Sequence, residues 1–218
     1  MLKRLVLLTL VVMISLSSFT GCKRDREYNE AEVIAAAKLL IEKSTKVNDI
    51  FYGKGIAIID DKSYANGSYY MADPLAVAEY GIETVEDMKE LARECFTVAY
   101  SNLLINTVLS SVSDDSGIQG LARYYQKVSS LDDTPECIMV LNDDGKYLLK
   151  DKITYNYDSL KVLRSEGEYV IISVYVDVEN PDGKTQNKEI EIKLLEENGV
   201  WKIDTPTYAR YTEGMNLS

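Results

Sequence analysis

The sequence predicts an α+β fold, with N-terminal helices packed on a C-terminal antiparallel β-meander. Residues 29–48 and 84–109 repeat apolar positions three and four apart, as one face of a helix does. From Cys137 onward apolar and polar positions alternate, which is typical of an antiparallel sheet with one solvated face. Because the two patterns occupy separate stretches of the chain, α+β is expected rather than alternating βαβ units.

A single domain is expected over residues 29–208, with its helical part at about 29–130 and its sheet at about 136–208. A chain of 218 residues has room for one or two domains. No internal repeat and no low-complexity linker divides this one. We therefore expect one domain, followed by a loose tail over residues 209–218.

The first segment of the chain has the three parts of a secretory signal peptide. The positive pair Lys3-Arg4 precedes the apolar run Leu5–Ile14, and small and polar residues follow up to Gly21. The apolar run is too short to remain as a membrane-spanning helix. Residues 1–21 are therefore expected to be a signal peptide that directs the chain out of the cytoplasm.

Cys22 directly follows a small residue, and the run Thr20-Gly21-Cys22 resembles the lipobox of bacterial lipoproteins, although Phe19 stands where that family usually has Leu. The resemblance implies that Cys22 becomes the new N-terminus and carries acyl chains such as palmitate. Two or more acyl chains hold a protein stably on a membrane. The implied partner is the membrane, bound through lipid on Cys22, with residues 22–28 as a tether on the extracytoplasmic face of the cell membrane. A plain signal with a coincidental cysteine is the alternative.

The first helix is expected over residues 29–48. Asn29 is a good N-cap, and Glu32 lies three residues on, as in a capping box. One apolar face runs from Val33 to Val47.

Residues 51–82 are punctuated by glycines, and short strands are expected at 55–59 and 68–71. Long irregular segments of this kind are often functional, so we expect any functional loop here. Tyr69 and Tyr70 are candidates for a contact surface, since exposed aromatic side chains anchor interfaces. The alternative is a strand with one of the two tyrosines buried.

Two helices are expected next. Thr84 and Asp87 mark the start of a helix over residues 84–96, and Thr97 starts a second that ends near residue 109. A loop over 110–117 and a short helix at about 118–128 follow.

The rest of the chain is expected to be strands joined by tight turns. Residues 137–141 and 146–150 flank Asn142-Asp143-Asp144-Gly145 as a hairpin, and shorter strands follow at 153–157 and 160–165. The last three strands are expected at 168–179, 185–195 and 200–204. Within the first of these, one face is expected in the core: Val170, Ile172, Val174, Val176 and Val178.

Charge and composition exclude several function classes. The chain has 35 acidic and 24 basic residues, a formal net charge of −11, so no nucleic-acid partner is expected. It has no His, which excludes Ser-His and Cys-His catalysis and removes the usual zinc ligand. We expect no enzymatic activity, no cofactor and no metal. Paired carboxylates are the one classical hydrolase chemistry left, and the adjacent acidic pairs lie at expected turns.

Two cysteines besides Cys22 leave two alternatives open. A disulfide between Cys95 and Cys137 is allowed outside the cytoplasm, and its loop closure would stabilise the fold by roughly 4 kcal/mol. The other alternative is two buried free thiols on separate elements.

Two resemblances meet in the C-terminal half. The run Asn198–Asp204 resembles the last hairpin of NTF2-like and cystatin-like domains, in which helices pack into a curved antiparallel sheet. The helix 84–96 leading into Phe96-Thr97, the hairpin 142–147 and the closing Trp201–Asp204 resemble the IseA-like family of DL-endopeptidase inhibitors, over about residues 80–208. That resemblance implies a wall-located protein that blocks peptidoglycan-cleaving peptidases, and it identifies no inhibitory residue in this chain.

These observations favour a non-enzymatic, membrane-anchored binding protein whose partner is a cell-wall peptidase. The alternative function is a small-ligand-binding or sensor domain of NTF2-like type. A carboxylate-based enzyme is the third hypothesis, and it requires two acidic side chains in one pocket.

Overall fold

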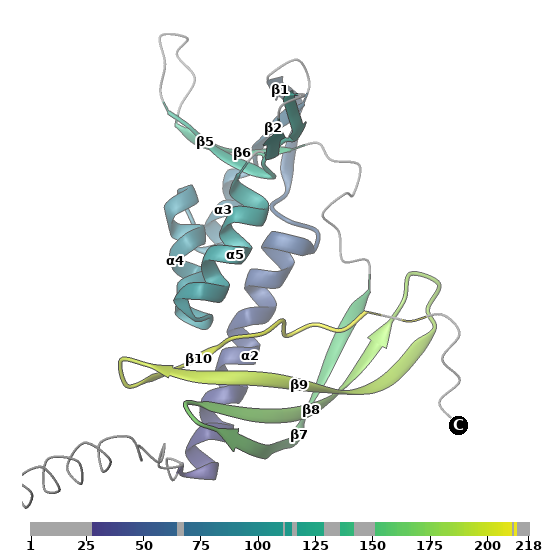
Figure 1. The fold of residues 1–218 in the computed structure, drawn as a ribbon. Helices are drawn as coiled ribbons and strands as arrows, with labels where there is room; N and C mark the ends of the chain where they lie inside the picture. Colours follow the sequence, from purple (N-terminus) through teal and green to yellow (C-terminus); the bar gives the residue numbers. More distant parts are fainter. Residues whose placement is uncertain are drawn as a thin grey trace, which may run out of the picture.

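A computed structural model describes residues 28–64, 68–110, 112–114, 117–128, 136–141, 151–210 and 212. The signal peptide, Cys22 and the second half of the expected hairpin after Leu141 lie outside these residues. The structure is α+β, as expected. Figure 1 shows a long twisted sheet at one end of the molecule, a small sheet at the other, and helices between them.

Helix α2 (Glu30–Tyr52) runs the length of this arrangement and contacts both parts (Figure 1). Asn29 caps it by accepting a hydrogen bond from the Ala31 amide at 3.2 Å. The helix continues past its expected end near Asn48, because the apolar face includes Ile50 and Phe51, and Gly53 then closes its last turn. Neither this helix nor any other described one is both long and apolar enough to cross a membrane.

The long sheet is the expected C-terminal meander, with strand order β10-β9-β8-β7 and antiparallel pairing throughout. Its strands are β7 (Lys152–Glu166), β8 (Tyr169–Glu179), β9 (Thr185–Glu197) and β10 (Val200–Ile203). The five β8 residues expected in the core are buried. The two strands expected at 153–165 are one strand with a bulge, since its pairing shifts between Asn156 and Lys161.

The small sheet was only partly expected. It has the order β1-β2-β6-β5 and consists of β1 (Ile58–Tyr64), β2 (Tyr69–Ala72), β6 (Cys137–Leu141) and β5 (Tyr124–Lys127). The prediction of a short helix at about 118–128 is wrong. That stretch holds β4 (Gly117–Gly120), paired with β3 (Val112–Asp114), and then β5, paired with β6. The fully buried ring of Tyr124, an aromatic residue suited to strands, fixes β5 against α2.

Three further helices cover the middle of the molecule: α3 (Pro74–Tyr80), α4 (Val85–Cys95) and α5 (Val98–Leu109). The start expected at Thr84 is confirmed, with a complete capping box between Thr84 and Asp87. Helix α3 was not expected, although Asp73 caps it and Pro74 occupies its first turn.

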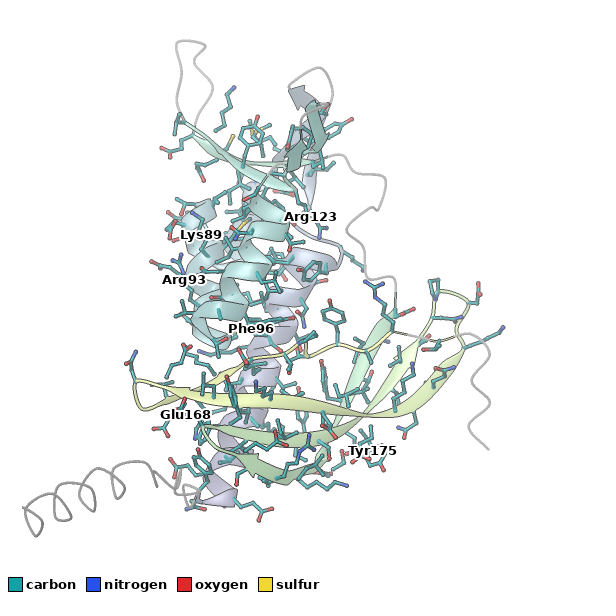
Figure 2. All side chains as sticks on the ribbon, viewed as in Figure 1. Lys89, Arg93, Phe96, Arg123, Glu168 and Tyr175 are labelled. Atoms are coloured by element: carbon teal, nitrogen blue, oxygen red, sulfur yellow. The ribbon has the colours of Figure 1, made fainter. Side chains whose placement is uncertain are left out.

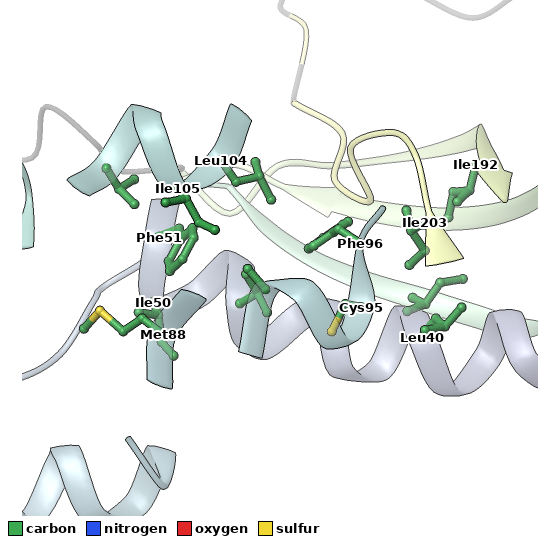
Figure 3. Packing of buried hydrophobic residues seen from close by; sticks show 14 of the residues in the cluster. Leu40, Ile50, Phe51, Met88, Cys95, Phe96, Leu104, Ile105, Ile192 and Ile203 are labelled. Atoms are coloured by element: carbon green, nitrogen blue, oxygen red, sulfur yellow. The ribbon is translucent and has the colours of Figure 1, made fainter. Parts of the chain in front are cut away.

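One hydrophobic core joins the helices to the long sheet. Figure 3 shows its packing, in which Phe96 from the end of α4 lies near Ile203 of β10 and Leu40 of α2. The backbone adds to this junction, since the Thr97 amide donates to the Ile203 carbonyl at 2.9 Å. The Thr97 hydroxyl donates to Asp204 at 2.6 Å. The helical end therefore holds a fixed position over the sheet.

Candidate functional site

The structure buries the first of the two tyrosines, Tyr69 and Tyr70, that were expected as a contact surface. Tyr69 is only 7% exposed, its hydroxyl donates to the Ala122 carbonyl at 2.7 Å, and its ring packs edge-on against Tyr125. Tyr70 is half-buried. The pair therefore matches the alternative, a strand with one tyrosine buried, and Tyr69 is a core residue.

Of the two alternatives for the cysteines, the structure has free thiols on separate elements. Cys95 is buried in α4, with its Sγ 3.5 Å from the Leu91 carbonyl, and Cys137 is half-buried in β6. Burial raises the pKa of Cys95 to about 11 and raises the pKa of Cys137 as well. Both thiols are therefore protonated at neutral pH and are poor nucleophiles.

The candidate site is a cavity of about 640 Å³ between the C-terminal half of α2 and the start of β7. The turn between β8 and β9 and the segment after β10 complete its walls. Its lining residues are Thr45, Asn48, Asp49, Gly53, Lys54, Asp151, Lys152, Ile153, Tyr155, Pro181 and Tyr208.

The α2 wall is formed by Thr45, Asn48 and Asp49, which share one face because they are three and four residues apart. The side chain of Asp49 is fixed by a hydrogen bond, since the Tyr80 hydroxyl donates to its Oδ2 at 2.6 Å. Burial, and then the hydrogen bond and charge of Asp49, raise the pKa of Tyr80, so that this donor keeps its proton. Gly53 leaves the room that Asp49 needs, since a Cβ there would lie 2.5 Å from Asp49 Oδ1.

The loop that carries Gly53 and Lys54 is fixed by a buried arginine. Arg123 is 4% exposed, and its guanidinium donates to the carbonyls of Phe51 at 2.6 Å and Gly53 at 2.8 Å. A cation at this position also complements the negative end of the α2 dipole. Figure 2 labels Arg123 near the small sheet, far from Glu168 and Tyr175, which mark the long sheet. The loop is thus part of the rigid framework.

The opposite wall depends on Thr207, which is fully buried. Its hydroxyl oxygen lies 2.8 Å from Ser44 Oγ and accepts a hydrogen bond from the Asn48 amide at 2.8 Å. Its carbonyl accepts a hydrogen bond from the Tyr155 hydroxyl. These bonds fix the segment after β10 against α2 and β7. They thereby place Tyr208, whose ring lies 6.0 Å from that of Tyr52, at the cavity.

The cavity combines apolar surface with charges of both signs. Ile153, Pro181 and the tyrosine rings supply the apolar part. Asp49 and Asp151 supply carboxylates, and Lys54 and Lys152 supply ammonium groups. Burial raises the pKa of Tyr155 to about 12, so its hydroxyl remains a donor to Thr207. In the described part of the chain, no three acidic or cysteine side chains cluster as metal ligands do.

The sequence did not point to most of this site. Gly53 and Lys54 fall within the segment where a functional loop was expected, but the other lining residues were not singled out. The two carboxylates in the cavity, Asp49 and Asp151, are not among the adjacent acidic pairs noted in the sequence. A local signal is the polar pair Asn48-Asp49 near the end of a helix that Gly53 and Gly55 follow.

Comparison of the chain with known protein families and with curated protein sequences finds no match.

Proposed function

We propose that this chain is a non-enzymatic binding protein, held by lipid on Cys22 at the extracytoplasmic face of the cell membrane, and that its cavity binds a small ligand. The cavity is the observation that carries the proposal. Its volume of about 640 Å³ lies within the range of ligand pockets, roughly 300–1,000 Å³. Its mostly apolar lining with a few charged groups is also typical of such pockets.

The position of the cavity supports binding by a preformed site. Helix α2 packs its apolar residues on the inner face of the long sheet, so the protein's own side chains cover most of that face. Space remains at one end, and there the walls are held by Arg123, Tyr80 and Thr207. A rigid site loses little entropy when a ligand binds.

The lining favours binding over catalysis. Asp49 already accepts a hydrogen bond from Tyr80, and the hydroxyl of Tyr155 is committed to Thr207. An acid–base mechanism requires side chains that exchange protons with the substrate. Groups that are committed to the fold serve better as fixed walls.

A cavity-filling substitution tests the proposal. Thr45 is exposed on α2 and lines the cavity, so Thr45→Trp places a large ring in it without disturbing the core. Leu39→Trp, at another exposed position of α2 that is 62% exposed, is the matched control. Ligand-observed NMR with a library of small metabolites is expected to give compounds that bind the wild-type and Leu39→Trp proteins and bind Thr45→Trp at least about tenfold more weakly, a loss of about 1.4 kcal/mol.

Two results would contradict this proposal. Compounds that bind all three proteins equally would place the site elsewhere, and a bound compound that is chemically converted during the measurement would make the protein an enzyme. The anchor has its own test: the wild-type protein is expected in the membrane fraction and a Cys22→Ser variant in the soluble fraction. Equal distribution of the two would argue against lipid on Cys22.

Inhibition of a cell-wall DL-endopeptidase is the second candidate function. The net charge of −11 favours it, because an acidic protein attracts a partner with a basic rim. Adding the purified protein to such a peptidase in equimolar amount is then expected to slow the cleavage of peptidoglycan. An unchanged rate of cleavage would remove this candidate and leave the small-ligand proposal standing.

A further inference from the structure

The charged residues that line the cavity indicate which class of ligand it can bind. Asp49 and Lys54 lie at the end of α2, and Asp151 and Lys152 lie at the start of β7, so each side of the cavity has one carboxylate and one ammonium group. The lining therefore carries no net charge. A ligand with a single charge would be attracted by one group of each pair and repelled by the other.

The helix end itself does not favour cations. The last carbonyls of a helix carry a partial negative charge that attracts positive groups. Here the guanidinium of Arg123 already binds the carbonyls of Phe51 and Gly53, so that charge is compensated within the fold. The side chains of Asp49 and Lys54 therefore determine which charges the cavity accepts at this end.

Both groups are well placed for a ligand. Asp49 Oδ2 accepts a hydrogen bond from Tyr80, while its other oxygen, Oδ1, lies beside Gly53, and both residues line the cavity. Lys54 is exposed, and its ammonium forms no ion pair with another described residue. Its backbone is held, since the Gly55 amide donates to the Asp49 carbonyl at 3.0 Å. Lys152 differs, because its ammonium lies 4.0 Å from a carboxylate oxygen of Glu179.

Apolar side chains form much of the rest of the lining. The side chains of Ile153 and Pro181 are pure hydrocarbon, and the hydroxyl of Tyr155 is bound to Thr207, which leaves its ring as the apolar part. Tyr208 adds a second ring, and an aromatic face also attracts an ammonium group. A ligand that matches this lining has one positive and one negative group beside an apolar body.

We infer that the cavity binds a zwitterion of the amino-acid or short-peptide type, with its ammonium at Asp49 and its carboxylate at Lys54. This inference rests on the proposal that the cavity is a ligand site, and it adds the class of ligand. A hydrogen bond to a charged group is stronger than one between neutral groups. Because Lys54 is exposed and solvent weakens its interactions, we expect each contact to change the affinity by only about tenfold.

The test uses apolar dipeptides, with leucyl-leucine as the first probe, together with their N-acetylated and C-amidated forms. Binding to the full chain is measured by isothermal titration calorimetry. The free dipeptide is expected to bind about tenfold more tightly than either blocked form. Asp49→Asn is expected to remove the preference over the N-acetylated form alone, and Lys54→Gln the preference over the C-amidated form alone. Thermal melting checks that both variants fold.

Two exposed residues away from the cavity supply matched controls. Asp158→Asn and Lys43→Gln change the same kinds of charge, and both are expected to keep the full preference for the free dipeptide. Blocked forms that bind as well as the free dipeptide would overturn the inference, and so would a panel of apolar amino acids and dipeptides with no binder. If other compounds still lose affinity with Thr45→Trp, the proposed function stands while this inference fails. If none does, both fail.

Discussion

The segment after β10 is predicted to be held by the hydroxyl of Thr207, and Thr207→Val tests this. Valine keeps the shape of threonine but loses the hydroxyl, so the contacts with Ser44 Oγ and the Asn48 amide, both at 2.8 Å, disappear. Thr207 and Ser44 are fully buried, whereas Asn48 is half-buried at the cavity. The two lost contacts are therefore not equivalent.

The expected loss follows from that difference. A hydrogen bond contributes about 1 kcal/mol net, and a buried group left without its partner costs about 1–3 kcal/mol. Ser44 Oγ also lies 2.8 Å from the Ile41 carbonyl and can still donate to it, so its side of the change is expected to cost only the lost hydrogen bond to Thr207, about 1 kcal/mol. Asn48 can bind water in the cavity, so its side is expected to cost about 0.5 kcal/mol. Thr207→Val is thus predicted to lower the free energy of unfolding by about 1.5 kcal/mol.

Urea unfolding monitored by circular dichroism measures this change. The midpoint is expected to fall while the slope with urea stays the same, because the surface exposed on unfolding does not change. Thr154→Val, on the exposed face of β7, is the control and is expected to stay within about 0.5 kcal/mol of wild type. A loss below about 0.5 kcal/mol for Thr207→Val would refute the role given to its hydroxyl.

Two further predictions concern the framework of the helical end. Gly55→Ala is expected to cost about 3 kcal/mol, because φ is +73° and a Cβ would lie 2.6 Å from Arg123 Nη2 and Tyr124 Oη, whereas Gly199→Ala, at φ +81° with open space, is expected to cost only about 1 kcal/mol. Equal losses in urea unfolding would contradict the close packing. Hydrogen bonds from the amides of Glu83 and Thr84 lower the pKa of Asp87 in the folded state. The ionised carboxylate therefore stabilises the fold at pH values above the ordinary pKa of 3.8, and this stabilisation is lost as the pH falls through the lower folded-state pKa. Asp87→Asn is therefore expected to be less stable than wild type at pH 7, with the difference shrinking below about pH 3.8, and a constant difference in melting temperature across this range would argue against the effect.

The sequence predicted correctly those helices and strands whose residues interact mainly with near neighbours in the chain or follow a regular apolar pattern. The five alternate apolar residues of β8, from Val170 to Val178, face the core as expected, although Ile171 and Ser173 on the other face are buried as well. The capping pair Thr84 and Asp87 located the start of α4, because both partners lie within one turn.

Elements stabilised by distant contacts were missed. Strand β5 was expected as a helix, yet Tyr124 donates to the Ile50 carbonyl at 2.6 Å, and no local pattern encodes this contact. Helix α3 had usable signals in Asp73 and Pro74, which were interpreted only as part of an irregular segment. Tyr69 illustrates a third limit, since a short strand pattern does not show which of two adjacent tyrosines is buried.

The cavity was missed for a related reason. Its lining comes from α2, the start of β7, the turn at Pro181 and the segment at Tyr208, which are far apart in the sequence. The bonds that position these residues, from Tyr80 to Asp49 and from Asn48 to Thr207, join different elements. Composition limited the chemistry through the absence of His, but only the packing of α2 on the sheet creates the space.

Mapping of a bound compound by two-dimensional NMR shows whether the cavity is the ligand site. The tightest binder from the small-molecule screen is titrated into ¹⁵N-labelled protein, and the amide shifts are followed. The largest shifts are expected at five residues that line the cavity: Thr45, Asp49, Gly53, Ile153 and Tyr208. Shifts confined to the β1-β2-β6-β5 sheet, or to the outer face of the long sheet, would contradict this expectation.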